Sequence, residues 1–246
     1  VITNNSYGLI TDDCNVFGIY DLVSRVLDQQ TFQMPNLQHV FAAGNSGDFI
    51  CAPYVAGFSN VLGSYQSSKN TISVGNADEL GVLISSSSKG PVRDGRIKPE
   101  VVAQGMFVNS TTPTHAYGSS SGTSMAAPAV SGGLALLYQR YRQLNAGANP
   151  KSGLMKTLIC NGATDKGNAG PDFSYGFGFM NLLRSVRMLE NNNYFNTTVN
   201  GAATNTHNII VPAGTAALKV MLYWNDSAAT AMSNPALIND LDLQVT

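Results

Sequence analysis

Up to about residue 190, the chain alternates between short apolar runs and longer stretches with helical spacing. Strand-like apolar runs cover residues 1–7, 39–43, 70–74 and 97–102, and helical spacing covers residues 16–29, 125–144, 151–159 and 181–189. A strand, a helix and a strand follow one another at the start of the chain, which favours parallel pairing and a right-handed crossover. The pattern therefore predicts an α/β fold built on a parallel sheet.

The pattern changes after Asn191. Residues 191–207 are polar, as is typical of a linker, and residues 217–226 and 238–246 alternate as strands do. We therefore expect two parts, with residues 1–192 forming an α/β domain and residues 193–246 forming a linker and the first strands of a β-domain. Because a few strands are marginal alone, we expect this second part to be incomplete.

Composition narrows the possible classes of protein. The chain has 246 residues, of which 43% are apolar, and no apolar run approaches the length of about 18 residues that a membrane span needs. A net charge of −1 and a charged fraction of 12% leave no basic surface of the kind that binds nucleic acid. The three cysteines, Cys14, Cys51 and Cys160, are too few for a disulfide scaffold. One pair is possible, but free buried thiols are favoured.

A serine precedes an alanine-rich, helix-like run in the segment GTSMAAPAVSGG, residues 122–133. Serine is a common helix cap, which is the simplest interpretation of Ser124. Pro128 lacks an N–H and is expected in a first turn, so the helix should begin at or near Ser124. A serine there has its own N–H and the positive end of the helix dipole directed at whatever lies over its oxygen. Ser124 is therefore a candidate nucleophile that carries half of an oxyanion hole.

A second candidate lies at the end of a predicted strand, in the segment HVFAAGNSGD, residues 39–48. The apolar run ends in Gly44-Asn45, which places an asparagine at the carboxyl end of a strand, where ligands bind in open α/β sheets. An ordinary strand-to-turn Gly-Asn would look the same. Together with Ser124, however, Asn45 is a candidate donor to a developing oxyanion.

The segments GTSMAAP and AAGNSG together resemble the nucleophile and oxyanion motifs of the subtilisin-like serine peptidases, or subtilases. Three further segments resemble the family in the same order: residues 3–8 its substrate-binding strand, residues 70–78 a core strand, and residues 85–105 the approach to the nucleophile. Gln104 departs from the family, which usually has proline there. The resemblance covers about residues 1–190. It implies a three-layer doubly wound parallel sheet, truncated at its N-terminal side, with the start of a C-terminal β-sandwich as in some bacterial alkaline-protease-like subtilases.

The same resemblance implies a function. The intact protein would be a secreted or cell-surface/periplasmic serine endopeptidase that hydrolyses proteins or peptides through an acyl-enzyme at Ser124, with Asn45 in the oxyanion hole and no cofactor required for the chemistry. An extended substrate would lie beside Ser6, Tyr7 and Gly8, and Ala42, Ala43 and Gly44 would line the S1 pocket. Because these small residues leave room and include no acid, apolar or aromatic P1 residues are expected.

The chain does not supply an evident general base. None of the three histidines, His39, His115 and His207, lies in a family-like context, and no aspartate does either. We therefore expect the base histidine and its orienting aspartate in a missing N-terminal part, and the present chain to be inactive alone. The alternative is a non-catalytic binding or adhesion protein on a decayed subtilase scaffold. A lipase-type elbow is disfavoured because Ala126 replaces its final glycine.

A structural calcium ion is also possible. Asp226, Asp240 and Asp242 carry oxygen ligands of the type that calcium prefers. Acidic residues exposed to solvent in turns would show the same pattern, and this second interpretation is favoured.

Overall fold

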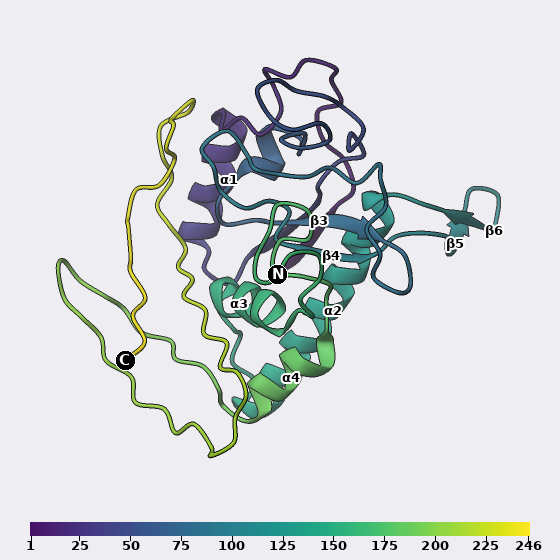
Figure 1. The fold of residues 1–246 in the computed structure, drawn as a ribbon. Helices are drawn as coiled ribbons and strands as arrows, with labels where there is room; N and C mark the ends of the chain where they lie inside the picture. Colours follow the sequence, from purple (N-terminus) through teal and green to yellow (C-terminus); the bar gives the residue numbers. More distant parts are fainter.

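A four-stranded parallel sheet forms the centre of the computed structural model, which describes residues 1–246 (Figure 1). Its strands are β1 (Ile2–Asn5), β2 (Gln38–Ala42), β3 (Ile72–Ala77) and β4 (Val101–Gln104), and they lie in this order across the sheet. Every neighbouring pair is parallel. The predicted α/β fold on a parallel sheet is confirmed.

Three helices cover one face of this sheet: α2 (Thr123–Leu144), α3 (Ser152–Gly162) and α4 (Leu182–Glu190). Side chains alternate across a strand, so every second residue contributes to the core beneath these helices. The sheet residues of this core are Val40, Ala42, Ile72, Val74, Val101 and Ala103. The fully buried Ala126, Ala127 and Val130 of α2 pack in the same core. Their small size lets the start of α2 lie close to the sheet.

Helix α1 (Leu22–Gln33) contributes no residue to this core, and in Figure 1 the sheet passes between α1 and α2. The helix begins later than the spacing of residues 16–29 predicts, because Asp21 caps it by accepting hydrogen bonds from the N–H groups of Val23 and Ser24. Beside α1 lies a short 3-10 helix, η1 (Ser64–Ser67), whose Ser64 carbonyl accepts a hydrogen bond from the Ser24 hydroxyl.

A hairpin of β5 (Val108–Thr112) and β6 (Ala116–Ser120) projects from the body between β4 and α2 (Figure 1). The sequence patterns did not predict this hairpin. Its residues are mostly exposed, and its strands lack the apolar alternation that marks a half-buried strand.

The residues after α4 contain no helix or strand, so the strands expected at residues 217–226 and 238–246 are not present. Both segments have strand-like alternation, but a strand needs a neighbouring strand to pair its backbone groups. Residues 194–246 instead run as extended chain alongside the body (Figure 1). The β-domain and the division of the chain at residue 192 remain predictions.

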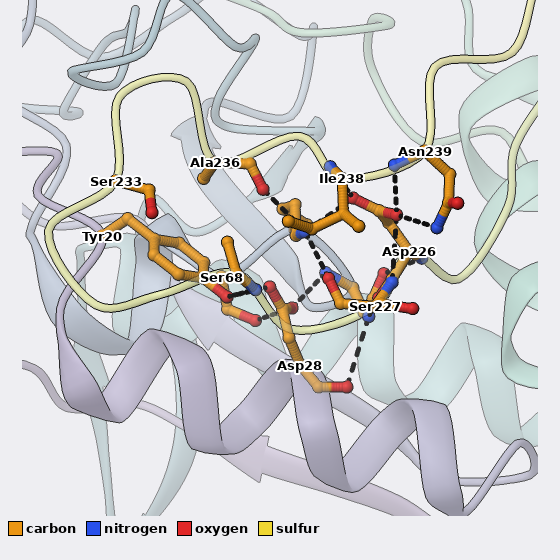
Figure 2. A network of polar contacts seen from close by, with 12 residues as sticks. Tyr20, Asp28, Ser68, Asp226, Ser227, Ser233, Ala236, Ile238 and Asn239 are labelled. Carbon is orange, nitrogen blue, oxygen red and sulfur yellow. Dashed lines mark hydrogen bonds and ion pairs between the residues drawn. The ribbon is translucent and has the colours of Figure 1, made fainter.

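Part of this C-terminal chain is anchored through a buried ion pair. The Lys69 ammonium donates to the Asp226 carboxylate at 2.6 Å and to the carbonyls of Ser227 and Ala236 at 2.6 and 2.8 Å. Figure 2 shows Asp226 next to Ile238 and Asn239, whose N–H groups donate to its two oxygens. The anchor fixes the C-terminal chain near η1, because Lys69 lies two residues after the end of η1.

The same contacts correct both interpretations of Asp226, which is neither an acid exposed to solvent, since it is buried in an ion pair, nor free to bind calcium. Its carboxylate accepts hydrogen bonds from Lys69, Ser227, Ile238 and Asn239 and has no oxygen left for a metal ion. Asp240 and Asp242 are exposed. No group of three or more histidine, cysteine, aspartate or glutamate side chains in residues 1–246 is placed to hold a metal.

The cysteine prediction was also wrong for two of the three residues. Cys14 and Cys51 form a disulfide across 37 residues, with their Cα atoms 5.4 Å apart, while Cys160 is a free, buried thiol. The spacing of the cysteines along the chain contains no information about this pair, because the fold alone brings the two loops together.

Candidate active site

The candidate nucleophile lies where the sheet meets the first turn of α2. The Ser6 hydroxyl, just after β1, donates to the Ser124 carbonyl at 2.8 Å, and the Ser124 hydroxyl donates to the Ser6 carbonyl at 3.4 Å. Ser124 is partly exposed. The chain therefore places the hydroxyl of Ser124 at the carboxyl ends of the strands, with the substrate-strand candidate Ser6 in direct contact.

Ser124 is not the helix cap. The cap position belongs to Gly122, which makes no side-chain capping bond and has a φ of 146°, a conformation that favours glycine. Ser124 is the second residue of α2, so its N–H has no acceptor within the helix. This leaves a backbone donor next to the hydroxyl, as an oxyanion hole requires.

Pro128 lies one turn further into α2 than the sequence predicted. A proline there cannot donate a hydrogen bond to the carbonyl four residues earlier, which is that of Ser124. That carbonyl accepts from the Ser6 hydroxyl instead. The break in the helix ladder thus provides the link that joins Ser6 to the start of α2.

Asn45 follows β2 and contacts the residue before Ser124. Its Oδ1 accepts from both the N–H and the hydroxyl of Thr123, each at 3.0 Å, and the Thr123 hydroxyl in turn accepts from the Gly44 N–H at 3.3 Å. These contacts occupy the oxygen end of the amide. The Asn45 Nδ2 makes no hydrogen bond within residues 1–246, and the residue is exposed. The amide nitrogen is thus available to a ligand.

The remaining sequence candidates form two backbone segments that lie near each other. Residues 6–8 continue β1, and residues 42–44 end β2, with Ala42, Ala43 and Gly44 all buried. The side-chain amide of Gln66 joins the segments, because its Nε2 donates to the carbonyls of Tyr7 and Ala42 at 3.0 and 2.9 Å. The sequence analysis missed Gln66. It lies in a serine-rich stretch without periodicity, and no local signal marks it.

None of the three histidines contacts Ser124. His39 lies on β2 and shares a 2.8 Å hydrogen bond with the Thr3 hydroxyl, and burial lowers its pKa. His115 is exposed at the tip of the β5–β6 hairpin, and His207 stacks on Phe195 in the C-terminal chain. No histidine therefore forms a hydrogen bond with the Ser124 hydroxyl in residues 1–246.

Comparison with known proteins gives consistent matches. Residues 1–178 match a family model described as the subtilase family. Subtilisin DY of Bacillus licheniformis is 35% identical over 143 residues, covering 58% of this chain and 44% of that protein. Pyrolysin of Pyrococcus furiosus is 31% identical over 186 residues, covering 61% of this chain and 12% of that protein. The chain thus spans less than half the length of these relatives.

Solved structures agree with this match. The self-cleaved protease domain of PatA has a TM-score of 0.59 at 25% identity, covering 77% of this chain and 62% of that chain. The prenylagaramide maturation protease PagA has a TM-score of 0.58 at 26% identity, with coverages of 76% and 62%.

Proposed function

Because this chain belongs to the subtilase family, we propose that it forms part of the catalytic domain of a serine endopeptidase. The observation that supports this most directly is the meeting of Ser124 and Asn45 at the start of α2, through Thr123. A serine nucleophile and a neutral amide donor are two parts of the machinery for peptide-bond hydrolysis.

In the proposed reaction, the Ser124 oxygen attacks the scissile carbonyl and loses its proton to a general base. The negative charge that develops on the carbonyl oxygen is stabilised by the Ser124 N–H and the Asn45 Nδ2. The base then donates its proton to the leaving amine, which leaves an acyl-enzyme on Ser124 that water hydrolyses. This chemistry requires no cofactor. A structural calcium ion would need ligands other than Asp226.

We propose that the general base is a histidine oriented by an aspartate, and that both lie outside residues 1–246. Two observations support this. His39, His115 and His207 all lie away from Ser124, and the chain spans only 44% of Subtilisin DY. Without a base the serine hydroxyl is a weak nucleophile.

The proposed substrates are proteins or peptides that bind in extended form beside Ser6, Tyr7 and Gly8. We propose that the enzyme acts outside the cytoplasm, in a secreted, cell-surface or periplasmic form. Relatives with the names Minor extracellular protease Vpr, of Bacillus subtilis, and Extracellular serine protease, of Serratia marcescens, support this location. The Cys14–Cys51 disulfide is also typical of oxidising compartments. No helix of the structure is long and apolar enough to cross a membrane.

The test is hydrolysis of an unstructured protein by the intact peptidase and by its Ser124→Ala variant. We expect Ser124→Ala to abolish cleavage. Ser233→Ala is the matched control, because its hydroxyl bonds to the Thr230 carbonyl in the C-terminal chain, away from the site. Residues 1–246 alone should cleave negligibly. Intact protein that binds peptides without cleaving them would favour the decayed-scaffold alternative.

A further inference from the structure

Three side chains occupy the space between the segments 6–8 and 42–44. A Cβ atom added to Gly8 would lie 2.6 Å from Leu62 Cδ1 and 2.7 Å from Gln66 Nε2, and one added to Gly44 would lie 2.7 Å from Leu62 Cγ. These distances are shorter than van der Waals contact. Leu62 therefore lies against the glycines of both segments, Gln66 lies against Gly8, and the Ser88 hydroxyl lies against Gly44 at 2.7 Å from the added Cβ. These side chains close the space between the segments at that depth.

Gln66 is held in this position through its side-chain Nε2 and its backbone carbonyl. Its side chain bridges the carbonyls of Tyr7 and Ala42, its own carbonyl accepts from the Ser73 hydroxyl at 2.9 Å, and the residue has no exposed surface. A buried amide that donates to two carbonyls costs free energy to displace, since both carbonyls would lose their partner. Displacement of Gln66 by a substrate side chain is therefore unfavourable.

Leu62 is held equally well. Its N–H donates to the Ala43 carbonyl at 3.0 Å, and its side chain is 7% exposed, in a cluster with Phe17 and Cys51. Cys51 is bonded to Cys14, so this cluster is also cross-linked. Leu62 therefore cannot move away from the slot, because Phe17 and Cys51 pack against it.

We propose that Gln66 and Leu62 form the floor of the P1-binding slot and limit the P1 residue to small side chains: glycine, alanine or serine. This inference rests on the proposed function, which places substrate beside residues 6–8, and on the expectation that residues 42–44 line the S1 pocket. It replaces the expectation of an aromatic or large apolar P1 residue, which considered only the small residues Ala42, Ala43 and Gly44 that line the slot. Gln66 is the specificity-determining residue, because truncating its side chain deepens the slot and removes the hydrogen bonds that join Tyr7 to Ala42.

The test is peptide binding, which does not depend on hydrolysis. Two peptides that differ only in a C-terminal alanine or phenylalanine are titrated against the full chain carrying Ser124→Ala, with binding followed by NMR. We expect the alanine peptide to bind about tenfold more tightly or better, since differences of a few methylene groups in a slot have effects of about this size. The additional change Gln66→Ala should raise the affinity for the phenylalanine peptide until the preference is lost or reversed.

Gln38→Ala is the matched control. Gln38 is also fully buried, its Nε2 also donates to two backbone carbonyls, those of His39 and Asn70, and its Oε1 also has no partner, as in Gln66. It should destabilise the chain similarly without changing the preference. The inference is overturned if neither peptide binds, if phenylalanine binds as well as alanine to the parent, or if Gln38→Ala changes the preference as Gln66→Ala does. Absence of hydrolysis in the intact enzyme would refute the proposed function alone.

Discussion

At the scale of single residues, Asn45 owes its orientation to Thr123. Two donors on Thr123 hold its oxygen, and this leaves only the nitrogen for an oxyanion. An asparagine amide can in principle turn over, but here the reversed orientation would place an N–H₂ against the Thr123 N–H, which can only donate. The polarity of the proposed oxyanion hole is therefore set by a neighbouring threonine.

We predict that Asn45→Ala lowers kcat of the intact enzyme about 10²- to 10³-fold with little change in KM. The magnitude is the one known for loss of such a donor in subtilisin, a member of the same family, and it is adopted rather than calculated. The reason is that the donor acts on charge that develops only in the transition state. Steady-state kinetics on a peptide ester and a peptide amide would measure the loss. A change confined to KM would show that Asn45 only binds substrate.

At the scale of secondary structure, the start of α2 depends on a carbonyl that the helix itself leaves without a donor. Pro128 removes the backbone donor to the Ser124 carbonyl, and the Ser6 hydroxyl replaces it. The end of β1 and the start of α2 are thereby joined in the same contact that positions Ser124, the proposed nucleophile.

This arrangement predicts a coupling between Ser6 and Pro128. Ser6→Ala alone should lower the free energy of unfolding by about 1–3 kcal/mol, because the Ser124 carbonyl loses its partner. In a Pro128→Ala background the restored N–H can serve that carbonyl, so the same change should cost less. A double-mutant cycle by urea denaturation measures the difference. Equal costs in both backgrounds would contradict the link.

The C-terminal chain is a second element whose placement depends on a few polar contacts. We predict that Asp226→Asn releases it locally, because the change leaves the Lys69 ammonium buried without its counter-charge, at a cost of about 3–5 kcal/mol. Hydrogen exchange at the amides of Ile238 and Asn239 should accelerate about a hundredfold or more. Asp240→Asn, at an exposed position, should leave exchange unchanged. Unchanged protection in Asp226→Asn would show that apolar packing, not the ion pair, holds the segment.

At the scale of the whole molecule, buried carboxylates determine the response to acid. Burial alone would raise the pKa of Glu100, but the charges of Lys156 and Lys98 outweigh it and hold that pKa below its ordinary value of 4.5. Burial would likewise raise the pKa of Asp226. Hydrogen bonds from Lys69, Ile238 and Asn239 outweigh this effect and hold that pKa below its ordinary value of 3.8. Both carboxylates therefore bind protons more readily in the unfolded chain.

We predict that stability decreases in two ranges as the pH falls from neutral. Below about 6.5 the unfolded chain binds a proton at His39 more readily than the folded chain, where burial lowers its pKa; below about 4.5 the stabilisation from the two carboxylates is lost as well. The stabilisation from a carboxylate with a lowered pKa is fully present above its unfolded pKa and is lost as the pH falls through its folded pKa. Thermal unfolding between pH 7 and pH 3 would measure this. Glu100→Gln should lower Tm at neutral pH and flatten the acid limb. An acid limb equally steep in Glu100→Gln would assign acid sensitivity to other groups.

The helices and strands of the α/β part, and the two motifs of the site, could be predicted from the sequence because each depends on residues close together in the chain. Apolar spacing predicted β1 to β4 and α1 to α4, with ends displaced by a few residues. At α1 the displacement has a local cause, because Asp21 caps the helix. Ser124 and Asn45 stood out because the residues next to them, Gly44 and the alanine-rich run to Pro128, belong to the same short motifs.

The tertiary structure alone decided the contacts between distant segments. The Cys14–Cys51 pair, the Ser6–Ser124 link and the insertion of Gln66 between Tyr7 and Ala42 join residues 24 to 118 positions apart. No local pattern specifies such partners, because each contact forms only once the sheet has brought the loops together. The strands predicted at residues 217–226 and 238–246 do not form for the same reason. Alternation makes a segment able to pair, but only a neighbouring strand supplies the hydrogen bonds that make it a strand.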